Sequence, residues 1–157
     1  MASNILAELS EDAIITKSCA KESAMIEVIT GRLYLAREDV FSRADLKQVT
    51  VVVNLSSNNN LLAPDCKKVN LRWDIGDDVE EKMFENLVRY CAGVMKAPKQ
   101  CLAIIGHHDT VDVVAACVLR EYLGCKTSIA LGIMRGKRTK CLTKESLVST
   151  IDSYRIS

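Results

Sequence analysis

The chain lacks a long hydrophobic run, and none of its 157 residues belongs to an apolar stretch near the ~20 residues that cross a bilayer. Its first residues also lack a basic segment followed by an apolar one, the pattern of a secretory signal. Charge of one sign is missing too: 21 Lys and Arg balance 20 Asp and Glu, for a net charge of +1. We therefore expect a cytoplasmic protein with no membrane and no nucleic acid among its partners.

The cysteines lack any C-x-x-C spacing, and their number, seven, is odd. Most of them lie beside apolar residues, as Cys91, Cys101 and Cys117 do. This pattern argues against a disulfide framework or a zinc site and predicts reduced, buried thiols in a reducing compartment.

Repeats, low-complexity tracts and linkers are absent as well. The length suffices for one domain with a core able to fold unaided. We expect an N-terminal extension over residues 1–25 and a single domain over residues 26–157.

Apolar periodicity predicts the order of the elements along the chain. Strands are expected at 26–29, 33–35, 49–55, 68–73 and 102–105, with a helical turn or two within 39–47 and a helix over 79–95. Helices are expected over 113–123, over 127–134 with Thr127 or Ser128 as its cap, and from about 143 to 154. Polar turns are expected at 74–78, 106–112 and 135–140. The order favours an α/β fold with a short, twisted, mostly parallel sheet flanked by helices.

Residues 101–124 form the most informative stretch, in which an apolar strand feeds an apolar helix through polar residues. α/β folds place anion-binding and catalytic groups at such strand-to-helix connections. A functional site is therefore predicted here first.

Short motifs elsewhere occur in a suggestive order and spacing. Residues 33–36 read LYLA, residues 52–56 read VVNLS, and Asp74 is followed ten positions later by Phe84. Together they resemble the LYLG strand, the VLNLS strand, and the general-acid loop with its following helix of dual-specificity protein phosphatases, which are cysteine-dependent enzymes. Further matches to the family's last two helices are Ala130, Met134, Arg138, Leu147 and Tyr154. The resemblance implies the family's three-layer α/β fold.

The family's signature loop, H-C-x5-R-S/T, is not reproduced. Aligned on residues 121–123, His107 falls on the motif histidine, His108 on the nucleophilic cysteine, Val114 on the arginine and Ala115 on the Ser/Thr. The positions of this degenerate loop are His107, His108, Asp109, Thr110, Val111, Asp112, Val113, Val114 and Ala115. No alternative alignment places a Cys and an Arg six positions apart, because no cysteine lies between 101 and 117.

These replacements remove the family's chemistry. The nucleophile must be a thiolate held at a helix N-terminus, and the arginine must clamp two phosphate oxygens. Asp109 and Asp112 instead add two carboxylates that repel a phosphate dianion. The resemblance thus implies a pseudophosphatase without catalytic residue or cofactor, with weak or absent phosphate binding and Asp74 as a vestigial general-acid position. Its partners are then proteins, which it binds or scaffolds.

An enzymatic alternative rests on the same stretch. His107, His108 and Asp109 combine ligand types for a divalent metal. The letters GHHDTVD also resemble a segment of di-zinc aminopeptidase-type hydrolases and one of DHH-type phosphoesterases. The alternative is therefore a metal-dependent hydrolase or phosphoesterase using His107, His108 and Asp109, or a phosphatase with His108 as nucleophile.

Overall fold

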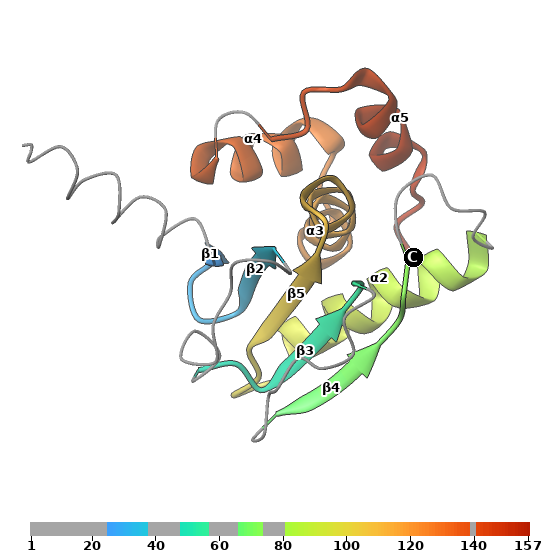
Figure 1. The fold of residues 1–157 in the computed structure, drawn as a ribbon. Coiled ribbons are helices and arrows are strands. Elements are labelled where there is room, and N and C mark those ends of the chain that lie inside the picture. The colour runs from blue at the N-terminus through green and yellow to red at the C-terminus, as the bar shows by residue number, and fades with distance from the viewer. Residues whose placement is uncertain (1–24, 38–47, 57–65, 74–80, 139–140) are drawn as a thin grey trace, which may run out of the picture.

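The computed structural model describes residues 25–37, 48–56, 66–73, 81–138 and 141–157. Within them Figure 1 shows a sheet with helices packed against it. The strands are β1 (Met25–Ile29), β2 (Leu33–Arg37), β3 (Val51–Asn54), β4 (Lys67–Asn70) and β5 (Leu102–Gly106). The helices are α2 (Glu81–Lys96), α3 (His108–Leu123), α4 (Thr127–Lys137) and α5 (Glu145–Ser153).

The strands form one sheet in the order β1-β2-β5-β3-β4. β1 pairs antiparallel with β2, and every other neighbouring pair is parallel. At the centre, Ile104 of β5 pairs with Leu35 of β2 and with Val53 of β3. All residues of β5 are buried, as its continuous apolar run predicts. The predicted α/β fold with a mostly parallel sheet is confirmed.

The described helices pack on one face of this sheet. Alternate strand residues point to opposite faces, and Leu35, Val53 and Ile104 share one core cluster with buried side chains of α2, α3, α4 and α5. Helix α3 lies at the centre of this layer (Figure 1) and is buried without interruption from Thr110 to Leu119. The opposite face carries a second cluster: Tyr34, Ala36, Val49, Val52, Cys101, Ala103 and Ile105.

Several predicted boundaries were wrong. α4 continues to Lys137, so Arg135 and Lys137 lie in a helix and not in a basic surface turn. Its N-cap is Lys126, which makes no side-chain capping bond, whereas the Thr127 hydroxyl donates to an Asp152 oxygen at 2.9 Å. Tertiary contacts therefore replaced the expected local cap. β4 ends at Asn70, before the predicted end at 73.

Other expectations lie outside the described residues. They concern residues 1–24 of the extension, the helical turn within 39–47, and the acidic turn at 74–78 with its vestigial general acid Asp74. Among the described helices, none is long and apolar enough to cross a membrane.

Candidate functional site

The junction between β5 and α3 is where the candidate site was predicted. β5 ends at Gly106, His107 is the N-cap of α3, and the helix begins at His108. The Val111 amide donates to the His107 carbonyl at 2.9 Å, which closes the first turn. A single residue therefore connects strand and helix, and the predicted polar turn over 106–112 was wrong.

Local chemistry explains this abrupt start. Residues 107–123 contain no glycine or proline that would stop a helix from extending toward the strand. Asp109 lies in the first turn, where a negative charge is favourable near the helix N-terminus. Gly106 allows the end of β5 to lie close to Leu55 and to the first turn of α3, since a Cβ at residue 106 would lie 3.2 Å from Leu55 Cβ and 3.3 Å from Val111 Cγ2. The apolar run of α3 can thus start its first turn directly at the strand end.

The nine predicted loop positions divide by exposure. His107 and His108 are exposed and Asp109 is half-buried, while Thr110, Val111, Asp112, Val113, Val114 and Ala115 are buried. The first three are therefore the positions most accessible to a ligand or partner. Val114, aligned with the family's arginine, is 0% exposed and belongs to the main core.

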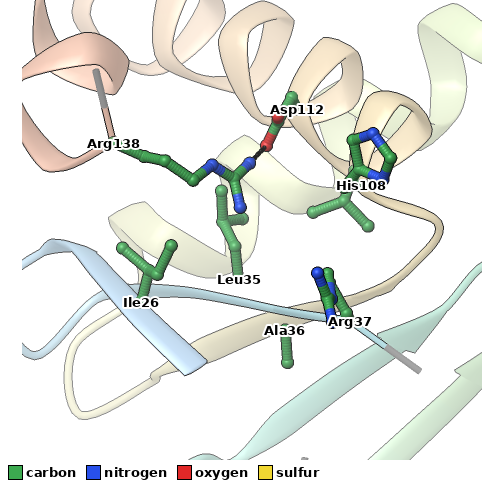
Figure 2. A pocket seen from close by; sticks show the side chains of 8 residues that line it. Ile26, Leu35, Ala36, Arg37, His108, Asp112 and Arg138 are labelled. Carbon is green, nitrogen blue, oxygen red and sulfur yellow. Dashed lines mark hydrogen bonds and ion pairs between the residues drawn. The ribbon is translucent and has the colours of Figure 1, made fainter. Parts of the chain in front are cut away.

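Asp112 is the charged residue buried most deeply at this junction. It is 1% exposed, and its Oδ1 accepts a hydrogen bond and ion pair from Nη2 of Arg138, the residue after α4 (Figure 2). Burial raises the pKa of Asp112, while the charge and hydrogen bond of Arg138 act in the opposite direction. The buried carboxylate thus has a cation supplied from 26 residues along the chain.

Asp109 also lies close to nitrogen atoms of two side chains. Lys144 Nζ lies 3.1 Å from its Oδ2, and His108 Nε2 lies 3.4 Å from its Oδ1. Lys144 is the N-cap of α5, so Asp109 and Asp112 both bind the connection between α4 and α5 to the start of α3. Sequence reasoning missed these pairings. The three-residue spacing of the two aspartates would place them on one helix face, had residues 108–112 been predicted as helix.

Two cavities adjoin these groups. The one drawn in Figure 2, beneath Arg138 and Asp112, has a volume of about 10 Å³, which suits no more than a single water molecule. An outer pocket of about 290 Å³ is lined by Arg37, His108, Asp109, Asp112, Arg138, Cys141, Leu142, Thr143 and Lys144. Its two carboxylates are each paired with a cation, so the pocket wall is largely neutralised internally.

The backbone at this junction differs from an anion-binding loop. From Val111 onward the amide groups follow helical geometry, in which each donates to the carbonyl four residues earlier. An oxyanion could therefore meet only the backbone amides before Val111, at the helix N-terminus. His108, aligned with the family's nucleophile, is exposed on the first helical residue.

The described cysteines are poorly suited to act as nucleophiles. Of the six described cysteines, Cys91, Cys101, Cys117 and Cys141 are buried, as predicted, whereas Cys66 and Cys125 are only half-buried; all six are free thiols in the structure. Burial raises the pKa of Cys91 and of Cys117 to about 12. Burial also raises the pKa of Cys141, the thiol that lines the outer pocket. A catalytic thiolate needs the opposite shift.

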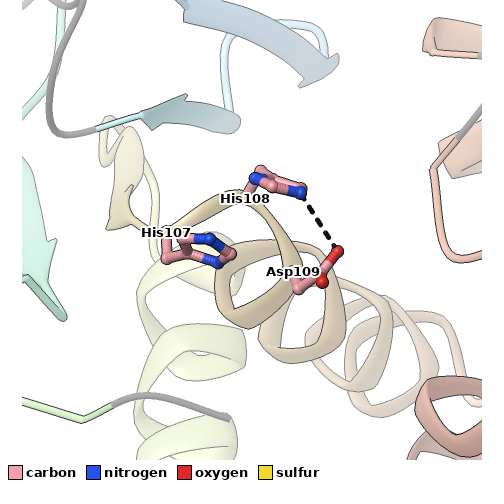
Figure 3. Close-up of side chains that lie close together, drawn as sticks. All are labelled: His107, His108 and Asp109. Carbon is pink, nitrogen blue, oxygen red and sulfur yellow. Dashed lines mark ion pairs between the residues drawn. The ribbon is translucent and has the colours of Figure 1, made fainter.

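His107, His108 and Asp109 are brought together, as the metal alternative requires (Figure 3). One potential ligand atom from each lies within 4.8 Å of the others, and the two imidazole centroids are 4.3 Å apart. Two imidazoles and a carboxylate suit zinc and its neighbours in the first transition row. Within the described part of the chain no fourth ligand joins them, so water or substrate oxygen would complete a tetrahedral ion.

The sheet order, the helical layer and the buried α3 together define a class of fold. No protein-family profile and no curated protein sequence matches the chain. Solved structures do match, and they are dual-specificity and protein tyrosine phosphatases. The chain therefore has the dual-specificity phosphatase fold that its motifs predicted.

Three of these structures show the extent of the similarity. DUSP15 superposes with a TM-score of 0.68 and 14% identity, over 83% of this chain and 86% of that one. Human DUSP28 gives 0.65 and 17%, over 82% and 90%. A mouse dual-specificity phosphatase complexed with zinc tungstate gives 0.63 and 16%, over 82% and 84%. The TM-scores establish the shared fold. Because the identities are low, any chemistry must be argued from this chain's own residues.

Proposed function

We propose that this chain is a catalytically inactive protein with the dual-specificity phosphatase fold, a pseudophosphatase that acts by binding or scaffolding proteins. One observation carries the proposal: α3 begins at His108, with Val114 buried where the resemblance expects the phosphate-clamping arginine. An imidazole on the first turn and a valine in the core supply neither thiolate nor clamp. Phosphate binding is accordingly weak or absent.

The internal ion pairs support the same conclusion. A phosphate dianion entering the outer pocket must compete with Asp112 for Arg138 and with Asp109 for Lys144. Both carboxylates belong to the same chain as their cations and are already held next to them, whereas phosphate would have to bind from solution. The balance favours the internal pairs, because a free ion also loses translational freedom on binding.

Catalytic inactivity is tested with p-nitrophenyl phosphate and the purified full chain, in EDTA and with added Zn²⁺ or Mg²⁺. We expect no turnover above the buffer rate in any condition. Metal-free turnover that is lost in His108→Ala and retained in His107→Ala would establish a histidine nucleophile and overturn the proposal. The exposed neighbour is the matched control, since both imidazoles lie at the same helix start.

A metal-dependent hydrolase is the second candidate, favoured by the proximity of His107, His108 and Asp109. Any bound ion would have to compete with Lys144 for Asp109. In the same assay this candidate predicts turnover that requires Zn²⁺ and disappears in each of the three alanine variants. Loss in all three, against loss in His108→Ala alone, separates a metal centre from a histidine nucleophile.

The binding role requires its own experiment. Immobilised full-length chain is used to capture proteins from cell extract, and each captured protein is then purified and titrated against the chain by calorimetry. Saturable one-site binding by at least one purified protein is expected. If every captured protein fails to bind once purified, the binding role is wrong.

A further inference from the structure

A groove lies along α2, away from the β5–α3 junction. Its volume is about 460 Å³, and it is lined by Val51, Lys67, Arg89, Tyr90, Gly93, Val94, Ala97 and Gln100. Val51 and Lys67 are the first residues of β3 and β4, and Val51 pairs with Leu102 at the start of β5. The groove therefore adjoins the amino ends of the parallel strands, whereas the β5–α3 junction is at a carboxyl end. In Figure 1, α2 runs beside β3 and β4.

Helix α2 contributes half of the residues that line the groove, through a second side-chain stripe. One face of the helix is buried against the core through Leu87, Val88, Cys91, Ala92 and Met95. The groove residues Tyr90, Gly93 and Val94 follow the spacing i, i+3 and i+4, which places them together on another face. Ala97, directly after the helix, continues this stripe, because its amide donates to the Gly93 carbonyl at 3.1 Å. They are half-buried or exposed, so this apolar stripe is open to a partner.

Gly93 determines what shape can enter. A Cβ built at Gly93 would meet no atom within 4 Å, so the space above it is open. Small residues on a helix allow a second helix to pack at a short interaxial distance. Gly93 and Ala97 lie one turn apart, with Tyr90 and Val94 beside them as apolar walls. The stripe thus fits about two turns of a packed helix.

Charge selects the kind of helix. Lys67 places its ammonium 5.7 Å from the Tyr90 ring centroid at the groove wall, and Lys96 and Lys99 are exposed beside the groove residue Ala97. None of these three lysines forms an ion pair within the described part of the chain. Arg89, by contrast, is near Glu85 at 3.5 Å and Glu121 at 3.9 Å. The groove rim is therefore positive, although the whole chain is nearly neutral.

We propose that this groove binds an acidic amphipathic helix of a partner protein. The apolar face of that helix packs on the Tyr90–Gly93–Val94–Ala97 stripe, and its flanking carboxylates face Lys67, Lys96 and Lys99. A second copy of this chain fits less well, because it would bring the same lysines against their equivalents. The inference rests on the proposed binding role and does not depend on the loss of catalysis.

The test uses the full-length chain and a fluorescein-labelled stapled helix of about 14 residues, long enough to hold several turns. One peptide carries a Leu/Ala face flanked by Glu, and a second carries the same face flanked by Lys. Fluorescence anisotropy should show saturable binding of the Glu peptide, at least about tenfold tighter than that of the Lys peptide and weakened by added salt.

Gly93→Gln fills the groove without straining the helix, because its Cβ enters open space and glycine is the poorer helix former. Gly132→Gln in α4 is the matched control, since a Cβ there also meets nothing within 4 Å. We expect Gly93→Gln and Lys67→Glu each to weaken Glu-peptide binding by about tenfold or more, and Gly132→Gln to leave it unchanged.

Several results would overturn the groove assignment. Equal affinity for the Glu and Lys peptides would show that the lysines do not select an acidic helix. Unchanged affinity in Gly93→Gln would show that the peptide binds outside this groove. A dimer in sedimentation that Gly93→Gln dissociates identifies a second copy as the occupant, and tight binding of an oligonucleotide identifies a nucleic acid. Phosphatase turnover measured on the same samples separates the two proposals. Turnover with intact peptide binding refutes inactivity alone, and failed peptide binding without turnover refutes the groove alone.

Discussion

The Asp112–Arg138 ion pair gives the most demanding test of how α3 begins. Arg138→Met removes the cation and leaves an uncompensated carboxylate that is 1% exposed. Breaking a buried pair in this way costs about 3–5 kcal/mol of unfolding free energy. The Arg138 side chain is 32% exposed and part of its charge is solvated, so the lower end applies, about 3 kcal/mol.

Thermal unfolding followed by circular dichroism measures this loss. For a chain of this size, 1 kcal/mol corresponds to about 2–4 °C in Tm, which predicts a decrease of roughly 6–12 °C. Lys137→Met, one residue earlier and exposed, is the matched control and should stay within about 0.5 kcal/mol of the parent. Asp112→Leu combined with Arg138→Met should recover most of the loss, because no buried charge then remains.

The loss must also depend on pH in a defined direction. Burial raises the pKa of Asp112 above its ordinary 3.8, and removing Arg138 takes away the main opposing influence, so the pKa rises further. A carboxyl with a raised folded-state pKa contributes stability at low pH, and this contribution disappears as pH rises through that pKa. Arg138→Met should therefore lose more stability at about pH 7 than at about pH 5. Equal losses at both pH values, or a loss below about 1 kcal/mol, would refute a buried, charged Asp112.

Three further predictions concern the strand-to-helix junction, the C-terminal segment and the core. Gly106→Ala places a Cβ 3.2 Å from Leu55 Cβ and should cost about 1–3 kcal/mol in urea unfolding; a neutral result would contradict the tight strand-to-helix connection. Glu121→Ala leaves two hydroxyl donors of the C-terminal segment, each at 2.7 Å, without their acceptor and should cost about 1–3 kcal/mol, whereas Glu121→Gln should cost less. His108→Cys with Val114→Arg should not restore tungstate binding by calorimetry and should lower Tm, because residue 114 lies in the core. Recovered binding would show that an anion-binding loop can still form.

The sequence predicted the sheet and the helical layer because each depends on local apolar patterning. Leu102 to Ile105 could be assigned to a buried strand from a run of four residues, and α2 from its helical spacing. The start of α3 could not be predicted in this way, because Thr110 and Asp112 are polar and resemble a loop. Burying Asp112 requires Arg138, which lies 26 positions away and whose approach depends on how α4 packs.

At the predicted site the backbone differs from the prediction, because a helix begins at His108 where a polar turn was expected. The proximity of His107, His108 and Asp109 followed from their adjacency, and the structure brings their ligand atoms together. The exposure of these residues could not be predicted from their adjacency. Six of the nine predicted positions are buried in the helix, two are exposed and one is half-buried. The α2 groove was not predicted at all. Its walls come from separate strands and a helix face, and Gly93 and Ala97 carry no distinctive sequence signal.

The polarity of β5 has a consequence for how many molecules this protein can hold. Its five residues span about 17 Å at ~3.3 Å each, with Leu102 near the α2 groove and Gly106 at the start of α3. A helix bound in the groove would leave the His107–His108 surface uncovered. An ion or partner bound at that surface would be held at a fixed distance from the groove, because a buried central strand and no flexible tether connects the two places.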